Sequence, residues 1–354
     1  MKHAELLKDA NVDQAIKNIE ETRDGHAFIE PLFLFKEFFA STPKPYPKRD
    51  KFIACLRKYF PSGYIPTKVE WLKGLYLAYC EALGKKLNRR IAPSIVFHAH
   101  AYYMSYDAKE MYDVFREFKY FKSYMPIRRT ISSLGGHVTA CIRSHFGIYT
   151  FSGDCFSLLS NYWNRQGIKT KTLYVPEDDE WLPYRKVIRF EDMKLEPRAT
   201  AEALCEFLDI PFDEIVMKVT VNGEEGNMGN IRNFDTTPVY RKREEYISPF
   251  DYYRLEVAFG RMMEPWGYKP IYYTDGVQYS KKEIMKMFDI RFKFEAYHYT
   301  LRQQRLSVKN RKAFCKLVKE FLDRDLTRNE AGQKLVPIPW LKPKEEFMEG
   351  KLYE

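Results

Sequence analysis

The sequence predicts an α/β protein in which a parallel sheet is flanked by helices. In residues 187–208, a short apolar strand runs into a helix whose apolar positions recur at helical spacing. Residues 94–134 repeat this order as strand, helix, strand and helix. Such alternation is typical of parallel strands joined by crossover helices.

The first part of the chain is predicted to be helical. Helices are expected at 4–22, near 49–59 and at 71–83. The third has the clearest apolar face, formed by Trp71, Leu75, Ala78, Tyr79 and Ala82. Gly84 suits the end of that helix.

The central part is predicted to alternate strands with helices. The expected strands are 94–100, 121–125, 172–175 and 187–190, and the expected helices are 108–118, 131 onward, 155–165 and 252–263. An acidic pair, Glu191-Asp192, stands where the last strand must end, and Pro197 precedes the next helix. The apolar positions of that helix are Ala201, Leu204, Phe207 and Leu208.

After Asp275 the chain becomes basic and aromatic, with a capping-box pattern at Ser280 and Glu283. Helices are expected at about 281–304 and 308–323. The second has one apolar face, formed by Phe314, Leu317, Val318, Phe321 and Leu322. We therefore expect an α/β domain over 1–276 and a helical extension over 277–354, which packs on the core or serves as an interaction arm.

The composition is that of a globular protein, with 45% hydrophobic and 30% charged residues. The net charge of +10 favours anionic partners but does not choose among nucleotides, sulfated or phosphorylated substrates, nucleic acid and a membrane surface. The six cysteines are scattered without metal-ligand spacing, so we expect mostly buried, reduced thiols and no metal site. The chain shows no signal peptide and no long apolar run, which predicts a cytoplasmic protein without a transmembrane segment.

Residues 189–213 carry the pattern R-F-E-D-M-x-x-x-P, then L-C-E-F-L in the helix and I-P-F-D after it. This stretch resembles the late strand–helix segment of sulfotransferases that use 3′-phosphoadenosine 5′-phosphosulfate. The resemblance covers roughly residues 90–270. It implies a P-loop-NTPase-like sulfotransferase fold, this nucleotide as the co-substrate without a metal, and transfer of a sulfuryl group to a hydroxyl of a glycan or small metabolite.

Two basic segments resemble the parts of that family that bind the 3′-phosphate of the nucleotide. Residues 119–134, KYFKSYMPIRRTISSL, are similar to a strand followed by R-D-P-x-x-R-x-x-S-S, with Tyr124 at the first Arg position. The phosphate ligands that this similarity implies are Arg128, Arg129, Ser132 and Ser133. Residues 236–248, TTPVYRKREEYIS, resemble a closing basic loop and imply Arg241 and Arg243. Without the resemblance, each segment also fits a solvated basic surface.

The candidate general base is His100 or His98, at the end of the SIVFHAH strand. A histidine there resembles the K-T-H segment of cytosolic sulfotransferases, and histidine can accept a hydroxyl proton near neutral pH. The two positions point to the same side of a strand. We prefer His100, because ligands bind beyond the ends of parallel strands; for either histidine, a structural role is the alternative.

The family's phosphosulfate loop has no clear counterpart. The closest string is residues 60–67, FPSGYIPT, which has Ser-Gly but lacks the Thr pair. We expect the first strand and this loop to be missing from the 1–276 domain or abandoned. A catalytically inactive, sulfotransferase-fold binding protein is therefore an alternative. A basic nucleic-acid-binding protein is a weaker one, and nucleic acid is not expected as a partner, because no recognition motif accompanies the charge.

Overall fold

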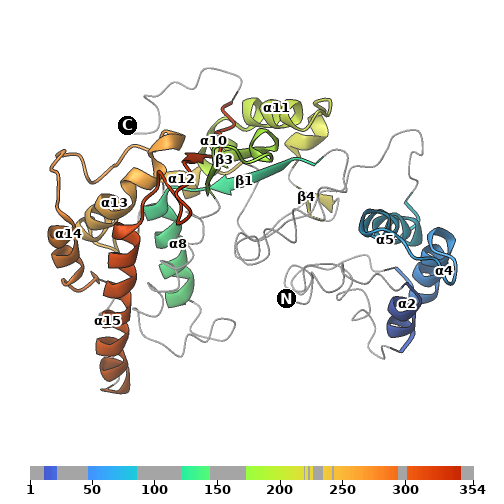
Figure 1. Cartoon of the computed structure of the whole chain (residues 1–354), viewed down its shortest axis with the longest axis horizontal. Helices are drawn as coiled ribbons and strands as arrows, with labels where there is room; N and C mark the ends of the chain where they lie inside the picture. The colour runs from blue at the N-terminus through green and yellow to red at the C-terminus, as the bar shows by residue number, and fades with distance from the viewer. Residues whose placement is uncertain are drawn as a thin grey trace. The chain divides into compact units, whose positions relative to one another are not determined.

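The structure, a computed structural model, describes residues 12–21, 47–85, 121–143, 173–218, 220–221, 224–225, 234–240, 243–293 and 301–343 (Figure 1). The chain divides into two compact units, residues 1–121 and 122–354. This border is set by packing and differs from the expected domain border at 276/277. The predicted strand at 94–100 and the predicted helices at 108–118 and 155–165 lie outside the described residues.

The described part of the first unit is helical, as predicted. It contains α2 (Val12–Glu21), α4 (Arg49–Tyr59) and α5 (Lys68–Ala82). Thr67 and Glu70 form a reciprocal capping box at the start of α5. The three helices share one core, formed by Val12, Ile16, Phe52, Leu56, Phe60, Trp71, Leu75, Ala78 and Ala82.

The second unit is an α/β structure built on a parallel strand pair. Strand β1 (Ser123–Ile127) pairs in parallel with β3 (Arg185–Arg189), and Ile127 lies opposite Arg189. Helix α8 (Thr130–Arg143) follows β1, and helices α10 (Phe190–Leu195) and α11 (Pro197–Phe207) follow β3. The order predicted around these two strands is therefore confirmed.

A segment near the C-terminus pairs with β2 (Tyr174–Pro176) in a second two-stranded sheet and forms an isolated parallel bridge to β3. Strand β6 (Leu335–Pro337) of this segment pairs antiparallel with β2. A few residues later, Val187 of β3 donates to the carbonyl of Pro339 and accepts from Leu341 N, at 2.9 and 2.8 Å. The expected parallel pairing is therefore seen for β1 and β3, while residues 277–354, expected to form a helical extension, contain a short strand besides their helices. The alternation of apolar residues with proline in LVPIPWL suits an extended segment, because proline cannot continue a helix.

The basic helices after residue 276 differ from their predicted bounds. The expected helix 281–304 ends early, since α14 spans Lys281–Phe288, and α15 (Leu301–Asp323) begins before the expected 308. The buried guanidinium of Arg254 donates to the carbonyls of Met287 and Ile290, at 2.7 and 2.6 Å. These bonds tie the end of α14 and the residues just after it to Arg254 of the preceding helix.

Helix α15 buries the face that its spacing predicts. Phe314 and Val318 are fully buried in the core of the second unit, with Phe321 and Leu322 beside them. They pack toward α13 (Pro249–Met263), and the rings of Phe259 and Phe321 lie 5.0 Å apart. Helix α11 differs from its prediction, because Ala199, Ala203 and Cys205 are buried while the four expected positions are only half-buried.

Short elements complete the described chain. They are the 3-10 turns η1 (Leu182–Tyr184), η2 (Glu214–Met217) and η3 (Glu264–Trp266), the strands β4 (Thr220–Val221) and β5 (Glu224–Glu225), and helix α12 (Thr237–Tyr240). Among the described helices, none has the length and apolar character needed to cross a membrane. The four cysteines whose side chains are described are free thiols, and Cys205 is the one that is buried.

Candidate functional site

The carboxyl ends of β1 and β3 lie side by side and carry charged residues. Arg128 and Arg129 follow β1, and Glu191 and Asp192 follow β3. Ligands of open α/β sheets bind beyond this edge of the strands. The paired ends of β1 and β3 therefore form the candidate site.

Glu191 connects three parts of the second unit. Its side chain is 3% exposed and accepts hydrogen bonds from Arg129 N at 3.1 Å and from the Tyr268 hydroxyl at 2.7 Å. Burial, reinforced by the Glu191 charge, raises the pKa of Tyr268 well above its usual value. The phenol therefore stays protonated and donates to the carboxylate.

Asp192 is the fully buried centre of a second set of polar contacts. Its Oδ1 accepts from Nε and Nη2 of Arg189, at 2.9 and 2.7 Å, and its Oδ2 accepts from the indole of Trp340 at 3.0 Å. Arg189 also lies 4.4 Å from the centre of the Trp340 ring. Burial raises the pKa of Asp192, an effect that the Arg189 guanidinium opposes. The bond between Trp340 and Asp192 therefore joins the end of β3 to the C-terminal segment.

The two arginines of the predicted phosphate clamp have different surroundings. Arg129 is 9% exposed, and its guanidinium donates to the carbonyl of Lys269 and lies 5.4 Å from the ring centre of Tyr268. Arg128 is half-buried, donates to the carbonyl of Pro238 at 2.6 Å, and stacks 4.6 Å from the ring centre of Phe190. The Arg129 side chain thus makes contacts inside the second unit, while the Arg128 side chain contacts the second basic segment, residues 236–248.

The structure brings the two predicted basic segments together at the start of α8. Besides the bond from Arg128 to Pro238, the side chain of Arg243 lies against α8, where a Cβ on Gly135 would stand 3.1 Å from Arg243 Cγ. Arg243 also lies 3.5 Å from Glu245. Ser132 and Ser133 occupy the first turn of α8 and are half-buried. Residues from both segments therefore converge on one helix end.

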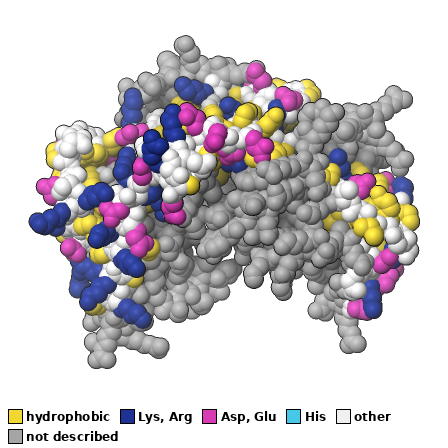
Figure 2. All heavy atoms as spheres, viewed as in Figure 1, with side chains coloured by type: hydrophobic (Ala, Val, Ile, Leu, Met, Phe, Trp, Pro, Cys, Tyr) yellow, Lys and Arg dark blue, Asp and Glu magenta, His cyan; other side chains and the backbone are white. Residues whose placement is uncertain are grey.

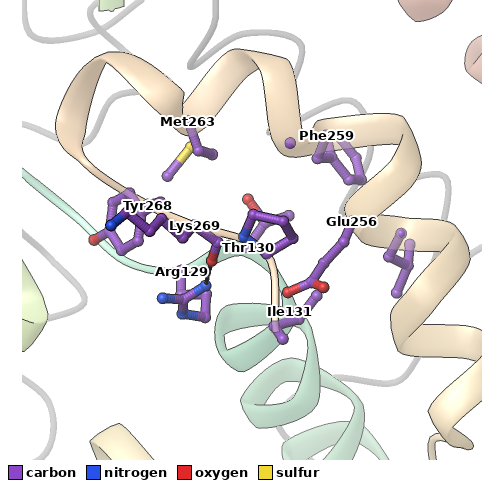
Figure 3. A pocket seen from close by; sticks show the side chains of 11 residues that line it. Arg129, Thr130, Ile131, Glu256, Phe259, Met263, Tyr268 and Lys269 are labelled. Atoms are coloured by element: carbon purple, nitrogen blue, oxygen red, sulfur yellow. Dashed lines mark hydrogen bonds between the residues drawn. The ribbon is translucent and has the colours of Figure 1, made fainter. Parts of the chain in front are cut away.

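A cavity borders this region between α8, α13 and the chain after α13 (Figure 3). Its lining includes Arg129, Glu256 and Tyr268, and its volume is about 30 Å³. That is room for one or two water molecules and not for a nucleotide. The Glu256 carboxylate is engaged by the backbone N–H groups of 271–273, at 2.6 to 3.0 Å.

Three predicted site residues, His98, His100 and Arg241, lie outside the described residues. The 60–67 string lies in the first unit. Ser62 Oγ and Gly63 N donate to the Asp13 carboxylate, at 3.2 and 2.9 Å, so this string binds a carboxylate of its own chain.

Sequence reasoning missed the roles of Tyr268 and Trp340. Both stand in short strings rich in aromatic residues, proline or glycine, PWGY and PIPW, which end an element and give no periodic signal. A buried aromatic residue with a polar group is expected to have a hydrogen-bond partner. Here the partners are the two acidic residues after β3, Glu191 for Tyr268 and Asp192 for Trp340. Comparison of the chain with protein families, curated proteins and solved structures found no match.

Proposed function

We propose that the protein is sulfotransferase-like, with a P-loop-NTPase-like sulfotransferase fold. It binds 3′-phosphoadenosine 5′-phosphosulfate and transfers the sulfuryl group to a hydroxyl of a glycan or small metabolite. One observation carries the proposal. The two basic segments that the family resemblance assigns to the 3′-phosphate, far apart in sequence, are in contact through Arg128 and Pro238.

The start of α8 has the physical properties that a phosphate needs. A helix N-terminus presents backbone N–H groups and a positive dipole end to an anion. Ser132 and Ser133 supply hydroxyl donors in the first turn, and Arg128 and Arg243 supply the cations. In the proposal, these side chains bind the 3′-phosphate, and Arg241 extends the same basic loop.

Transfer of the sulfuryl group requires a residue that accepts the proton of the acceptor hydroxyl. The acceptor hydroxyl oxygen attacks sulfur, the bond from sulfur to the bridging oxygen breaks, and adenosine 3′,5′-bisphosphate leaves. His100, or His98 beside it on the same strand face, takes the hydroxyl proton as general base. Cationic side chains stabilise the charge that develops on the leaving oxygen.

A second candidate function is nucleotide binding without turnover, as in a catalytically inactive relative. The orientation of the Arg129 side chain favours it. Its guanidinium faces the carbonyl of Lys269 and the ring of Tyr268 rather than the start of α8. Tyr124, which stands at the family's first Arg position, is 38% exposed and brings no charge. Such a protein would keep the sheet and an anion site but turn over no donor.

A thermal-shift titration of the full chain with adenosine 3′,5′-bisphosphate tests the site. A ligand at a hundred times its Kd stabilises the native state by about 2.7 kcal/mol. Arg243→Ala and Ser132→Ala should reduce the shift. Arg198→Ala, which removes an exposed partner of Glu214, should leave it unchanged. No shift in the wild type would sink the proposal, and full shifts in both site variants would mean that the clamp lies elsewhere.

The two proposed functions differ in turnover. Incubation with 3′-phosphoadenosine 5′-phosphosulfate and a panel of hydroxyl compounds should release adenosine 3′,5′-bisphosphate if the protein is an enzyme. His100→Ala should then abolish release while leaving nucleotide binding intact. Binding without any release across the panel would favour the inactive relative.

A further inference from the structure

Residues 281–320, which contain α14 and most of α15, carry most of the net charge of the chain. They hold twelve Lys and Arg residues against four Asp and Glu residues, a net +8, whereas the whole chain has +10. Figure 2 shows dark-blue side chains gathered over these two helices. A field concentrated on one surface draws anions to that surface in particular.

Four lysines form a line along α15, which we call the lysine stripe: Lys309, Lys312, Lys316 and Lys319. They follow one another at steps of three, four and three residues, so neighbours share one helix face. All four are exposed, and they lie opposite the face that carries Phe314 and Val318 into the core. At 1.5 Å per residue, the stripe extends over about 15 Å.

The charges of the stripe contribute little to holding the two helices together. Lys281 and Arg311 do that, through ion pairs with Asp323 at 2.8 Å and Asp289 at 3.9 Å. Within the stripe, Lys316 lies 3.7 Å from Glu320 on its own helix. Across the described ranges, no ion pair involves Lys309 or Lys312. Their ammonium groups can therefore meet an external anion without breaking the fold.

We propose that the lysine stripe docks on the sugar–phosphate backbone of a nucleic acid duplex, without regard to sequence. One strand of a duplex presents a phosphate about every 3.4 Å along the axis, so about four phosphates face a stripe of this length. Four lysines match them in number and reach. Lysine is a common phosphate ligand, and the stripe contains no Asn or Gln that would read adenine, so in this proposal the contacts are to phosphate.

A membrane surface suits the stripe less well. Interfacial helices insert an apolar face between lipids, whereas the apolar face of α15 is buried in its own core. The missing recognition motif argues against a sequence-specific binder, and a line of lysines requires no such motif. This docking surface is independent of the proposed nucleotide site at the start of α8.

The test measures binding of the full chain to a fluorescently labelled DNA duplex of mixed sequence across a series of salt concentrations. The stripe variant carries Lys309→Gln, Lys312→Gln, Lys316→Gln and Lys319→Gln. The matched control carries the same change in net charge on exposed lysines of the first unit: Lys17→Gln, Lys51→Gln, Lys73→Gln and Lys85→Gln. Four phosphate contacts give the wild type a slope of log K against log salt of about −3.6 or steeper.

The stripe variant should bind at least about tenfold more weakly at low salt, with a slope shallower by about three to four, while the control stays within about one of the wild type. If the stripe variant melts early, the double variant Lys309→Gln/Lys312→Gln replaces it, with about half the change in slope. Three results would overturn the proposal. They are no duplex binding by the wild type, equal losses in both variants, and binding to phosphatidylserine vesicles but not to the duplex.

Discussion

The indole N–H of Trp340 donates to Oδ2 of Asp192 at 3.0 Å, which joins the C-terminal segment to the residue pair that ends β3. The same carboxylate takes both Arg189 bonds through its other oxygen. Asp192, at the end of β3, is therefore held both by a residue of that strand and by the C-terminal segment. Gly267, at φ 70°, allows the Trp340 ring to pack this closely, because a Cβ at position 267 would stand 3.1 Å from the ring.

Trp340→Phe should destabilise the second unit. The substitution keeps a ring beside Arg189 but removes the donor to a fully buried carboxylate oxygen. The expected loss is about 1–3 kcal/mol, measured by urea unfolding. Tyr184→Phe, at a side chain that is 45% exposed, serves as control and should cost less than about 0.5 kcal/mol. Equal costs would show that the indole bond contributes nothing.

Arg189→Met should be more costly, because it leaves Asp192 buried without its cation. Breaking a buried pair from one side costs about 3–5 kcal/mol. The double variant Arg189→Met/Asp192→Leu should recover part of that loss, since no charge then remains buried. Arg198→Met, which breaks an exposed pair with Glu214, should cost about 0–1 kcal/mol. A double variant as unstable as the sum of its singles would contradict the assignment.

Alkaline pH should weaken the second unit through its buried phenols. Burial raises the pKa of Tyr174 and of Tyr252 to about 12, and that of Tyr268 well above 10.0. The unfolded chain loses these protons first, so the stabilisation is present below pH 10 and falls as the pH rises above it. Tyr268→Phe should lower stability at neutral pH and flatten this alkaline decline. Unfolding curves across pH 8–12 measure both effects, and an unchanged decline would exclude Tyr268 as a contributor.

Much of the fold could be predicted from local pattern. The apolar spacing in 308–323 and 252–263 places Phe314, Val318 and Phe259 in the core, where the structure has them. Strands β1 and β3 follow from short apolar runs between helical stretches. These signals depend on neighbours in sequence, which a single chain displays directly.

The C-terminal strand could not be predicted in this way. Val336 pairs with Val175 and Trp340 with Val187, partners more than 150 residues away, and two prolines interrupt the segment. Proline in a short apolar run usually marks an edge or a loop. The orientation of Arg129 is hidden for the same reason, because its acceptor, the Lys269 carbonyl, lies 140 residues along the chain.

Gly135→Ala should disturb the contact between α8 and the second basic segment. Its new Cβ would meet Arg243 Cγ at 3.1 Å and the Tyr252 hydroxyl at 3.4 Å, so Arg243 must move. We expect weaker binding of adenosine 3′,5′-bisphosphate, with helix propensity offsetting part of any loss of stability. Gly260→Ala, where the Cβ meets nothing within 4 Å, is the control and should gain about 0.5–1 kcal/mol without changing affinity. If Gly135→Ala leaves the affinity for the nucleotide unchanged, Arg243 does not contact the nucleotide.

The most direct measurement is the discrimination between two nucleotides by the wild-type chain. Calorimetric titrations with adenosine 3′,5′-bisphosphate and with adenosine 5′-phosphate give the two affinities. These nucleotides differ only in the 3′-phosphate, which the start of α8 is proposed to bind. A charge-assisted clamp contributes about 1.5–3 kcal/mol, so the bisphosphate should bind roughly ten- to a hundredfold more tightly. Arg243→Ala should remove most of that preference. Equal affinities for the two nucleotides in the wild type would contradict the account.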